Sequence, residues 1–416
     1  MKYKSITLIN LPSPWLISDR VHMPMGLLYL AGYIESKGYD VNILDLSGGV
    51  YKDFKLPEAD IYGISMVTPQ YHYALKLLNR IKTETGKPVI CGGIHPTSLP
   101  DSCLGFDAII RGEGEYALLD IMENGIKEHV YGIQYVDDLN ELPDPAWHLI
   151  DCESYISNID VMKYMKSGKS VEREINMFIS RGCNGKCAYC TSYKGRARRL
   201  SIDRVMSQII HLKKKYNINR ICFCDDNFVL NKRWLRELCD ILKDLDIKWH
   251  CLGRADMVDY DLCKFMYDHG CMGIDYGIES GSQKILDLVR KNTTVEKQEA
   301  GIKSACDAGI KVRAQFIVGL PGETEETFKE NYEFIKRNNK YVAKWGIHIF
   351  IPFPSCDIWH NPDKYGYKID KNVDFSDYQT IGNPETWSFQ PVEYAERNNR
   401  WRKEILQLIK DKDIAK

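Results

Sequence analysis

Three cysteines lie close together near the middle of the chain, in the stretch RGCNGKCAYC at residues 181–190. Cys183, Cys187 and Cys190 follow one another at x3 and x2 spacing, which is typical of metal ligands. A structural zinc site needs four ligands, and no other short-spaced pair of cysteines or histidines occurs nearby. A [4Fe–4S] cluster held by three cysteines leaves one iron open to a small molecule. The spacing favours such a cluster, with zinc and unligated thiols as the alternatives.

The other cysteines have no ligand spacing. The chain contains 14 cysteines, and several lie in apolar, strand-like runs where buried reduced thiols are expected: Cys91, Cys222, Cys224 and Cys251. Cys222 and Cys224 alternate along one run and would share one face of a strand. Reduced cysteines, together with an N-terminal apolar run too short for a signal peptide or membrane span, predict a cytoplasmic protein.

The composition is that of a globular protein. Its 416 residues, of which 44% are hydrophobic, suffice for two domains, and 56 basic residues nearly balance 57 acidic ones. This balance suggests neither a nucleic-acid clamp nor an acidic tail. We therefore expect neither a nucleic-acid partner nor a membrane.

Short apolar runs alternate with helical patterns in the first third of the chain. Continuous apolar strands separated by helices are typical of parallel β/α winding, so a Rossmann-like, doubly wound domain is predicted for residues 1–135. Five strands are expected by residue 112, at 4–10, 39–46, 59–66, 88–93 and 107–112. The rhythm fades from about residue 126, and residues 136–172 are interpreted as a linker.

A second β/α series follows, with six apolar runs at 174–180, 220–226, 248–254, 272–280, 311–320 and 344–352. Six strands with helices between them predict a partial (β/α)6 barrel over residues 173–360. In such barrels chemistry gathers at the C-terminal ends of the strands, where the loops converge. The cysteine stretch follows the first of these strands directly. Other polar residues also follow strands: Asp225, Asp226, Arg254, Glu279, Ser280 and Glu323.

The sequence CNGKCAYC resembles the C-x3-C-x2-C motif of radical S-adenosylmethionine (SAM) enzymes, with Tyr189 in the aromatic position before the third cysteine. The resemblance implies that Cys183, Cys187 and Cys190 hold a [4Fe–4S] cluster whose open iron is chelated by the amino and carboxylate groups of SAM. An electron from a reducing partner such as flavodoxin or ferredoxin would then cleave SAM to methionine and a 5′-deoxyadenosyl radical.

Further SAM contacts are implied at two strand ends. The segment YGIESGS is similar to the family's Gly-x-Glu-Ser segment, in which Glu279 or Ser280 would bind the ribose or amino group of SAM. The alternative for Glu279 is an ion pair with Arg254 or Arg313. The segment QFIVGLPGE is similar to the strand that passes under adenine, with Gly319 allowing the ring to approach, although it also reads as an ordinary turn.

Three more side chains are candidates for SAM binding. Arg254 and Arg313 offer a planar, bidentate fork for the SAM carboxylate, and structural ion pairs are the alternative for each. Tyr189 would contact adenine, with plain packing as its alternative.

The first domain resembles the cobalamin-binding domain of the B12-associated class of radical SAM enzymes, through MPMGLLYLAGYIESKGYDVNILDL, ISMVTPQ, VICGGIHPTSLPD and AIIRGEGEYALL. The resemblance implies cobalamin beyond the carboxyl ends of the strands, near Thr68, Gly93, His95, Gly112 and Glu113. The Asp-x-His-x-x-Gly motif, which supplies a lower ligand in other cobalamin proteins, is absent. Cobalamin would therefore bind without it, and His95 is expected to be an exposed loop histidine with no metal role.

Three functional hypotheses follow. The leading one is a cobalamin-dependent methyltransferase that acts on an unactivated carbon of a small molecule. The second is a cobalamin-independent radical SAM dehydration, epimerisation or rearrangement, with a vestigial B12-type domain. The third, from another class, is a non-catalytic zinc or cluster protein that senses a ligand through its Rossmann-like domain.

Residues 361–416 are expected to cover the substrate and to end in an amphipathic closing helix with Trp401, Ile405 and Ile409 on its buried stripe. Pro354-Ser355-Cys356 replaces the Pro-Gly-Thr of many relatives. Cys356 is interpreted as a packed structural cysteine or as an active-site thiol.

Overall fold

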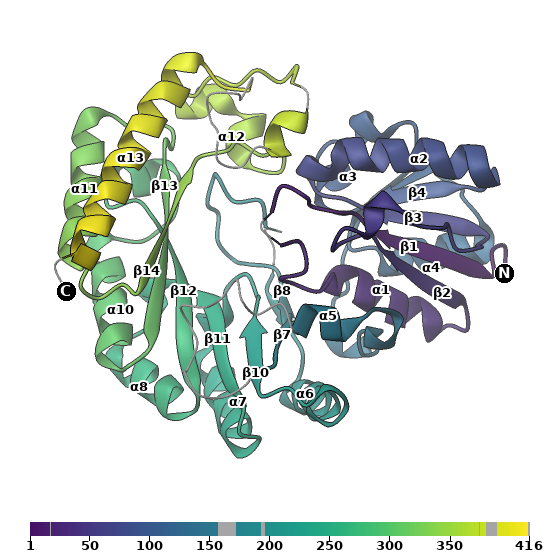
Figure 1. Cartoon of the computed structure of the whole chain (residues 1–416), viewed down its shortest axis with the longest axis horizontal. Coiled ribbons are helices and arrows are strands. Elements are labelled where there is room, and N and C mark those ends of the chain that lie inside the picture. The colour runs from purple at the N-terminus through teal and green to yellow at the C-terminus, as the bar shows by residue number, and fades with distance from the viewer. Residues whose placement is uncertain (17, 157–171, 193–195, 374, 380–388, 415–416) are drawn as a thin grey trace. The chain divides into compact units, whose positions relative to one another are not determined.

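The computed structural model describes the whole chain except residues 17, 157–171, 193–195, 374, 380–388 and 415–416 (Figure 1). The chain forms two compact units. The first comprises Met1–Val161, Phe353–Ser355 and Val373–Ile381, and the second comprises Met162–Pro352, Cys356–Asn372 and Gly382–Lys416. Each unit contains one six-stranded parallel sheet, so the predicted α/β fold class is confirmed.

The sheet of the first unit has the strand order β2-β1-β3-β4-β5-β6. Its strands are β1 (Ser5–Asn10), β2 (Asp40–Asp45), β3 (Ile61–Ser65), β4 (Val89–Gly92), β5 (Ala108–Gly112) and β6 (Val130–Gln134). The five predicted strands are confirmed. The sixth lies in the region where the sequence rhythm faded, and it pairs with β5 at the edge of the sheet.

Helices cover both faces of this sheet, as a doubly wound fold requires (Figure 1). They are α1 (Met25–Glu35) and α4 (Glu115–Asn124) on one face, with α2 (Tyr71–Thr85) and the short α3 (Ile94–Ser98) on the other. The core between α2 and the sheet is apolar and includes Ile64, Leu78 and Ile109. The strand order reverses between β1 and β3, and the loops after the strands at such a point are where ligands bind.

The segment interpreted as a linker begins as part of the first unit. It contains α5 (Cys152–Ile156) and two short 3₁₀ turns, Leu139–Glu141 and Trp147–Leu149. The hydroxyl of Tyr155 donates to a carboxylate oxygen of Asp45 at 2.7 Å and lies 3.1 Å from the hydroxyl of Ser47. Residues 157–171 lie outside the described residues. The boundaries at 135, 172 and 360 therefore stay predictions.

The sheet of the second unit has the order β14-β13-β12-β11-β10-β7, and all five pairings are parallel. Its strands are β7 (Glu174–Met177), β10 (Arg220–Phe223), β11 (Lys248–Gly253), β12 (Cys271–Glu279), β13 (Lys311–Val318) and β14 (Lys344–Ile349). These are the six predicted strands, in chain order across the sheet. The predicted partial (β/α)6 barrel is confirmed.

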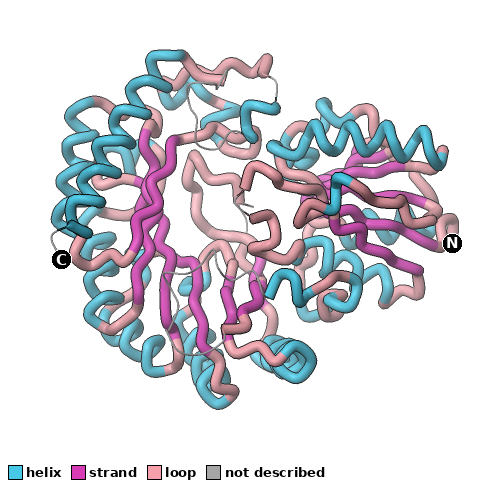
Figure 2. Tube along the Cα trace, in the orientation of Figure 1, coloured by secondary structure: helices cyan, strands magenta, loops and turns pink. Residues whose placement is uncertain are grey.

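The helices of the second unit lie along the outer side of its curved sheet (Figures 1 and 2). They are α6 (Ile202–Tyr216), α7 (Lys232–Asp244), α8 (Tyr260–Asp268), α9 (Gln283–Leu288), α10 (Val295–Asp307) and α11 (Glu325–Asn338). Strand β13 shows the alternation that this packing requires, because Ala314 and Phe316 are fully buried while Arg313 and Gln315 are only half-buried. Arg313 and Gln315 therefore lie on the face of β13 opposite to these buried side chains.

The last part of the chain closes the second unit with α12 (Asp357–His360) and α13 (Val392–Ile414). Trp401 and Ile405 of α13 are fully buried, and the Trp401 ring stacks on Phe328 with centroids 4.9 Å apart. Ile409 is only half-buried, so it contributes less to this stripe than predicted. Cys356 is fully buried, as a packed cysteine would be. Within the described part of the chain, no helix is both long and apolar enough to cross a membrane.

Candidate functional site

The three clustered cysteines lie in a loop whose two ends are paired. The short strands β8 (Ser180–Arg181) and β9 (Arg198–Arg199) flank this loop and pair in antiparallel register. Asp225, which follows β10, accepts hydrogen bonds from the Ser180 hydroxyl and from the Ile179 N–H, the latter at 3.1 Å. Burial raises the pKa of Asp225 to about 7, against the opposing effect of the Ser180 hydrogen bond. The loop is thus fixed to the end of the neighbouring strand.

Backbone N–H groups already point at two of the three sulfurs. The Gly185 N–H donates to Sγ of Cys183 at 3.3 Å, and the Ser192 N–H donates to Sγ of Cys190 at 3.4 Å. A Cβ at Gly185 would lie 3.3 Å from Sγ of Cys183, a tight contact, and 3.9 Å from Sγ of Cys187, so the backbone at Gly185 lies directly beside both sulfurs. All three cysteines are half-exposed and unbridged. Three accessible thiols with N–H donors fit a cluster with one open iron.

A buried lysine links the cysteine loop to the end of β12. Nζ of Lys291 lies 3.4 Å from Oε1 of Glu279 and donates to the hydroxyl of Tyr189 at 3.2 Å. Glu279 has a left-handed backbone (φ 69°) next to a register shift in the β12–β13 pairing, which is an uncommon conformation for a residue with a side chain. Burial raises the pKa of Glu279, and the charge of Lys291 opposes this shift.

The alternative for Glu279, an ion pair with Arg254 or Arg313, is not found among the described residues. Glu279 pairs with Lys291 instead. Arg254 binds both carboxylate oxygens of Asp256, through Nε at 2.9 Å and Nη2 at 2.8 Å. Arg313 pairs with Asp275 at 3.2 Å. Both arginines thus make structural ion pairs, the role that was named as the alternative to binding the SAM carboxylate. The sequence did not single out Lys291, which lies in a turn rather than at a strand end.

A second buried network joins the ends of β12 and β13. The carboxylate of Glu323 accepts hydrogen bonds from the N–H of Gly319 and, at 2.7 Å, from the side-chain amide of Asn331. The amide oxygen of Asn331 accepts in turn from the Ser280 hydroxyl and the Gly281 N–H, each at 2.8 Å. The structure therefore connects Ser280 and Gly319, two of the strand-end positions predicted to contact SAM, although Ser280 itself is fully buried.

Replacing Glu323 with glutamine should flatten part of the pH dependence of stability. Burial raises the pKa of Glu323 from 4.5 to about 7, although the Gly319 N–H and Asn331 oppose the shift. Between these values the folded protein keeps a proton that the unfolded chain has released, so the free energy of unfolding falls as the pH rises through this window. Chemical denaturation should show that, from about pH 5 to 8, the free energy of unfolding of Glu323→Gln falls by roughly 1–3 kcal/mol less than that of the unmodified protein.

The exposed Glu326 offers a matched control. Glu326→Gln should retain the pH dependence of the unmodified protein. Glutamine at position 323 also lacks one of the two acceptor oxygens of glutamate, which changes stability at every pH. The variants are therefore compared by the slope of the free energy of unfolding against pH, and not by its value at one pH. Equal slopes for Glu323→Gln and the unmodified protein would contradict the prediction.

The residues predicted to line the cobalamin side lie after β3, β4 and β5. Gly93 has φ 102° and ψ −171°, a conformation available essentially only to glycine, and a Cβ there would lie 2.7 Å from the Met66 carbonyl oxygen. Gly112 also has a positive φ of 79°. The carboxylate of Glu113 accepts from the Val136 N–H at 2.7 Å. Both glycines let neighbouring backbone approach closely, because a Cβ at Gly112 would likewise lie 2.9 Å from the Gln134 carbonyl oxygen.

The expectation for His95 as an exposed loop residue is wrong. It lies in α3 and is fully buried. Its Nδ1 is 3.2 Å from the hydroxyl of Thr68, and its Nε2 is 3.0 Å from the hydroxyl of Ser102. Its ring packs on Tyr71 and Phe375, with centroids 4.9 Å away in each case. His95 therefore holds Thr68 and the start of the ligand-side loop in place.

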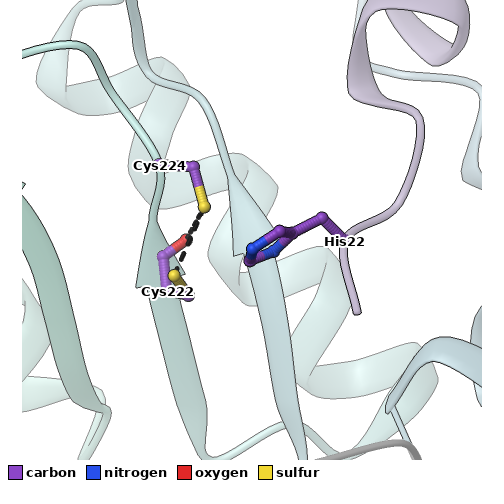
Figure 3. Close-up of side chains that lie close together, drawn as sticks. All are labelled: His22, Cys222 and Cys224. Atoms are coloured by element: carbon purple, nitrogen blue, oxygen red, sulfur yellow. Dashed lines mark hydrogen bonds between the residues drawn. The ribbon is translucent and has the colours of Figure 1, made fainter. Parts of the chain in front are cut away.

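Cys222 and Cys224 project from the end of β10 on the same side, as their alternation predicted (Figure 3). Their Sγ atoms are 3.3 Å apart. The hydrogen bond with Cys224 and burial raise the pKa of the Cys222 thiol, which keeps it protonated. No disulfide joins these two cysteines.

Comparisons with known proteins agree with this geometry. Residues 177–335 match the Radical SAM superfamily and residues 18–122 match the B12 binding domain. The chain is 30% identical over 362 residues to the uncharacterized methyltransferase PH0819 of Pyrococcus horikoshii, covering 81% of this chain and 77% of that protein. It is 29% identical over 399 residues to the anaerobic magnesium-protoporphyrin IX monomethyl ester cyclase of Rubrivivax gelatinosus, covering 86% and 69%.

Among solved structures, the fold resembles the cobalamin-dependent S-adenosylmethionine radical enzyme OxsB with aqua-cobalamin bound, with a TM-score of 0.66 and 21% identity. The match covers 87% of this chain but only 56% of OxsB, so the chain spans little more than half the length of that enzyme. The two domain matches confirm [4Fe–4S], SAM and cobalamin as the cofactors of the family. With a B12-binding domain ahead of its radical SAM domain, the chain belongs to the cobalamin-dependent radical SAM methyltransferase family.

Proposed function

We propose that this protein methylates an unactivated carbon atom of a small molecule. The observation that carries the proposal is the presence in one chain of a three-cysteine loop suited to an open cluster and a B12 binding domain. When bound, the reduced cluster and SAM supply a carbon-centred radical, and cobalamin supplies the methyl group.

The residues of the second unit divide this work. Cys183, Cys187 and Cys190 hold the cluster. Tyr189, between two of these ligands, places its aromatic ring beside the SAM site, and its hydroxyl is fixed by Lys291. Gly319, whose N–H donates to Glu323 and whose Cα packs against the side chain of Asn398, shapes the turn after β13 that the family uses on the adenine side. A flavodoxin or ferredoxin supplies the electron.

The inner face of β12–β14 supports a polar substrate. The side-chain amide of Gln315 donates to both carboxylate oxygens of Asp275, at 2.8 and 3.0 Å. Its oxygen therefore faces Nε2 of His348, 2.8 Å away, which donates to it. A Cβ at Gly346 would lie 2.1 Å from this oxygen, so the glycine makes the contact possible. The His348 side chain is exposed, but partial desolvation and the charges of Arg313 and Arg402 lower its pKa, so Nδ1 keeps its lone pair near neutral pH. A substrate hydroxyl or amino group fits this acceptor.

Product analysis tests the proposal. Reconstituted protein, incubated anaerobically with SAM, a strong reductant and methylcobalamin, should form both 5′-deoxyadenosine and S-adenosylhomocysteine once its substrate is present. Failure to form S-adenosylhomocysteine with any substrate, while 5′-deoxyadenosine accumulates, would rule out methyl transfer.

The second candidate is a radical SAM reaction that needs no cobalamin, such as dehydration, epimerisation or rearrangement. The likeness to the cyclase of Rubrivivax gelatinosus favours only its outcome, because the name of that enzyme describes ring closure rather than methylation. An absorption spectrum taken after reconstitution with cobalamin and desalting separates the two candidates. A retained corrin spectrum supports methylation, and complete loss of corrin supports the second candidate.

A further inference from the structure

Cys222 and Cys224 lie on the inner side of the curved sheet of the second unit. The strand residues that alternate with them, Ile221 and Phe223, are fully buried, and the Phe223 ring stacks on Phe228 with centroids 4.6 Å apart. The helices of this unit lie along that outer side (Figure 1). Cys222 is buried, whereas Cys224 is half-exposed. Cys224 is therefore the thiol of the pair that a small reagent reaches first.

The two thiols are close enough to form a bond with each other, since their Sγ atoms are 3.3 Å apart. Residues two apart in a strand have Cα atoms about 6.4–6.8 Å apart, whereas a disulfide usually joins Cα atoms about 5.5–6 Å apart. A disulfide between Cys222 and Cys224 therefore requires the end of β10 to shorten by up to about 1 Å. Such a bond is strained, and strained disulfides are readily reduced again.

Two aspartates follow Cys224 directly, and both contact the loop that contains the three clustered cysteines. Asp225 fixes the start of this loop through the two hydrogen bonds described above. Asp226 interacts with the N–H of Gly182 at the start of the loop and with the hydroxyl of Ser192 further along it. A shift of Cys224 toward β10 therefore displaces both carboxylates and loosens the loop.

We propose that Cys222 and Cys224 form a reversible disulfide that loosens the contact between the end of β10 and the cysteine loop. The oxidant is a small disulfide such as oxidised glutathione. The Cys224 thiolate attacks one of its sulfurs, forms a mixed disulfide and expels one glutathione thiolate. Cys222 then loses its proton, attacks the Cys224 sulfur and expels the second glutathione thiolate, so two protein thiols are oxidised while one glutathione disulfide is reduced. This inference goes beyond the proposed function, because the disulfide forms whether or not a substrate is methylated.

Anaerobic treatment of cluster-loaded protein with oxidised glutathione tests the proposal. Mass spectrometry after alkylation and digestion should find the peptide with both cysteines unalkylated and lighter by two hydrogens than its reduced form. The rate of iron transfer to a ferrous chelator then reports on the cysteine loop. Treated protein should release iron about tenfold faster than untreated protein, the factor expected when one hydrogen bond to a carboxylate is lost. Dithiothreitol, added before the chelator, should restore the slower rate.

Three variants control this test. Cys224→Ser lacks the accessible thiol, so its iron release should not respond to oxidised glutathione. Cys222→Ala should stop at the mixed disulfide, seen as one added glutathione, and keep the slower release. Cys306→Ala, which removes a half-exposed cysteine of α10, should respond like the unmodified protein. Two reduced thiols after the treatment, or a disulfide that leaves iron release unchanged, would overturn the inference and leave the proposed function intact.

Discussion

Replacing Cys187 with alanine should leave a folded protein that no longer assembles its cluster. Cys187 is the middle ligand of three, and the family's chemistry needs three thiolates on three irons. Its side chain is half-exposed, so the free energy of unfolding should change by less than about 1 kcal/mol. Iron and sulfide analysis should show the cluster lost or greatly reduced, and reductive cleavage of SAM to 5′-deoxyadenosine should fall to background.

Cys306→Ala is the matched control, because Cys306 is also half-exposed but lies in α10, far along the chain from the three-cysteine loop. This variant should keep both the cluster and SAM cleavage. Full iron and sulfide content in Cys187→Ala, or bound zinc without sulfide in the unmodified protein, would contradict the assignment of the site.

Replacing Gly93 with alanine should abolish cobalamin retention while sparing the cluster. An alanine Cβ would lie 2.7 Å from the carbonyl oxygen and 3.0 Å from the nitrogen of Met66, and the backbone conformation is one that only glycine adopts readily. Met66 directly follows β3, so relief of the clash moves the loop that carries Thr68. The first unit should lose about 2–4 kcal/mol of stability, through strain and displaced backbone together.

Gly38→Ala separates backbone strain from steric displacement. Gly38 also has a positive φ, of 86°, but nothing lies within 4 Å of the position of its Cβ. This variant should lose only about 1–2 kcal/mol and keep its corrin. The measurement is the corrin absorption that survives desalting, with iron content as the reference for the second unit. Normal corrin retention by Gly93→Ala would show that this loop does not bind cobalamin.

Most of the fold is readable from the sequence because both sheets are parallel and covered by helices. Strands buried on one or both faces become apolar runs, and eleven of the twelve strands in the two sheets were expected from such runs. Strand β6 was missed for a physical reason. It is an edge strand in which only Tyr131 is buried, so it lacks the apolar signal. Strands β8 and β9 were also not predicted. Each has only two residues, and their pairing depends on the loop between them.

The candidate site was readable only where its chemistry is local. Cysteine spacing within eight residues carries its own signal. The sequence around Lys291 carries no such signal. Lys291 contacts Glu279 only because Arg254, which follows β11, donates a hydrogen bond to the turn that contains Lys291. His95 shows the same limit, since its burial requires Phe375, which is distant in the chain. Such contacts join segments that are distant in the sequence and form only on folding, so the pattern of neither segment alone predicts them.

The central claim is that the methyl group of SAM reaches a carbon atom of a small molecule through this protein. The most direct measurement uses SAM with a trideuterated methyl group, methylcobalamin prepared with the same label, and a small-molecule extract as the source of substrate. Anaerobic reaction with reductant should yield a product that carries CD₃ in place of one hydrogen, together with 5′-deoxyadenosine and S-adenosylhomocysteine in similar amounts. A changed product that contains no deuterium, formed with 5′-deoxyadenosine alone, would contradict the account.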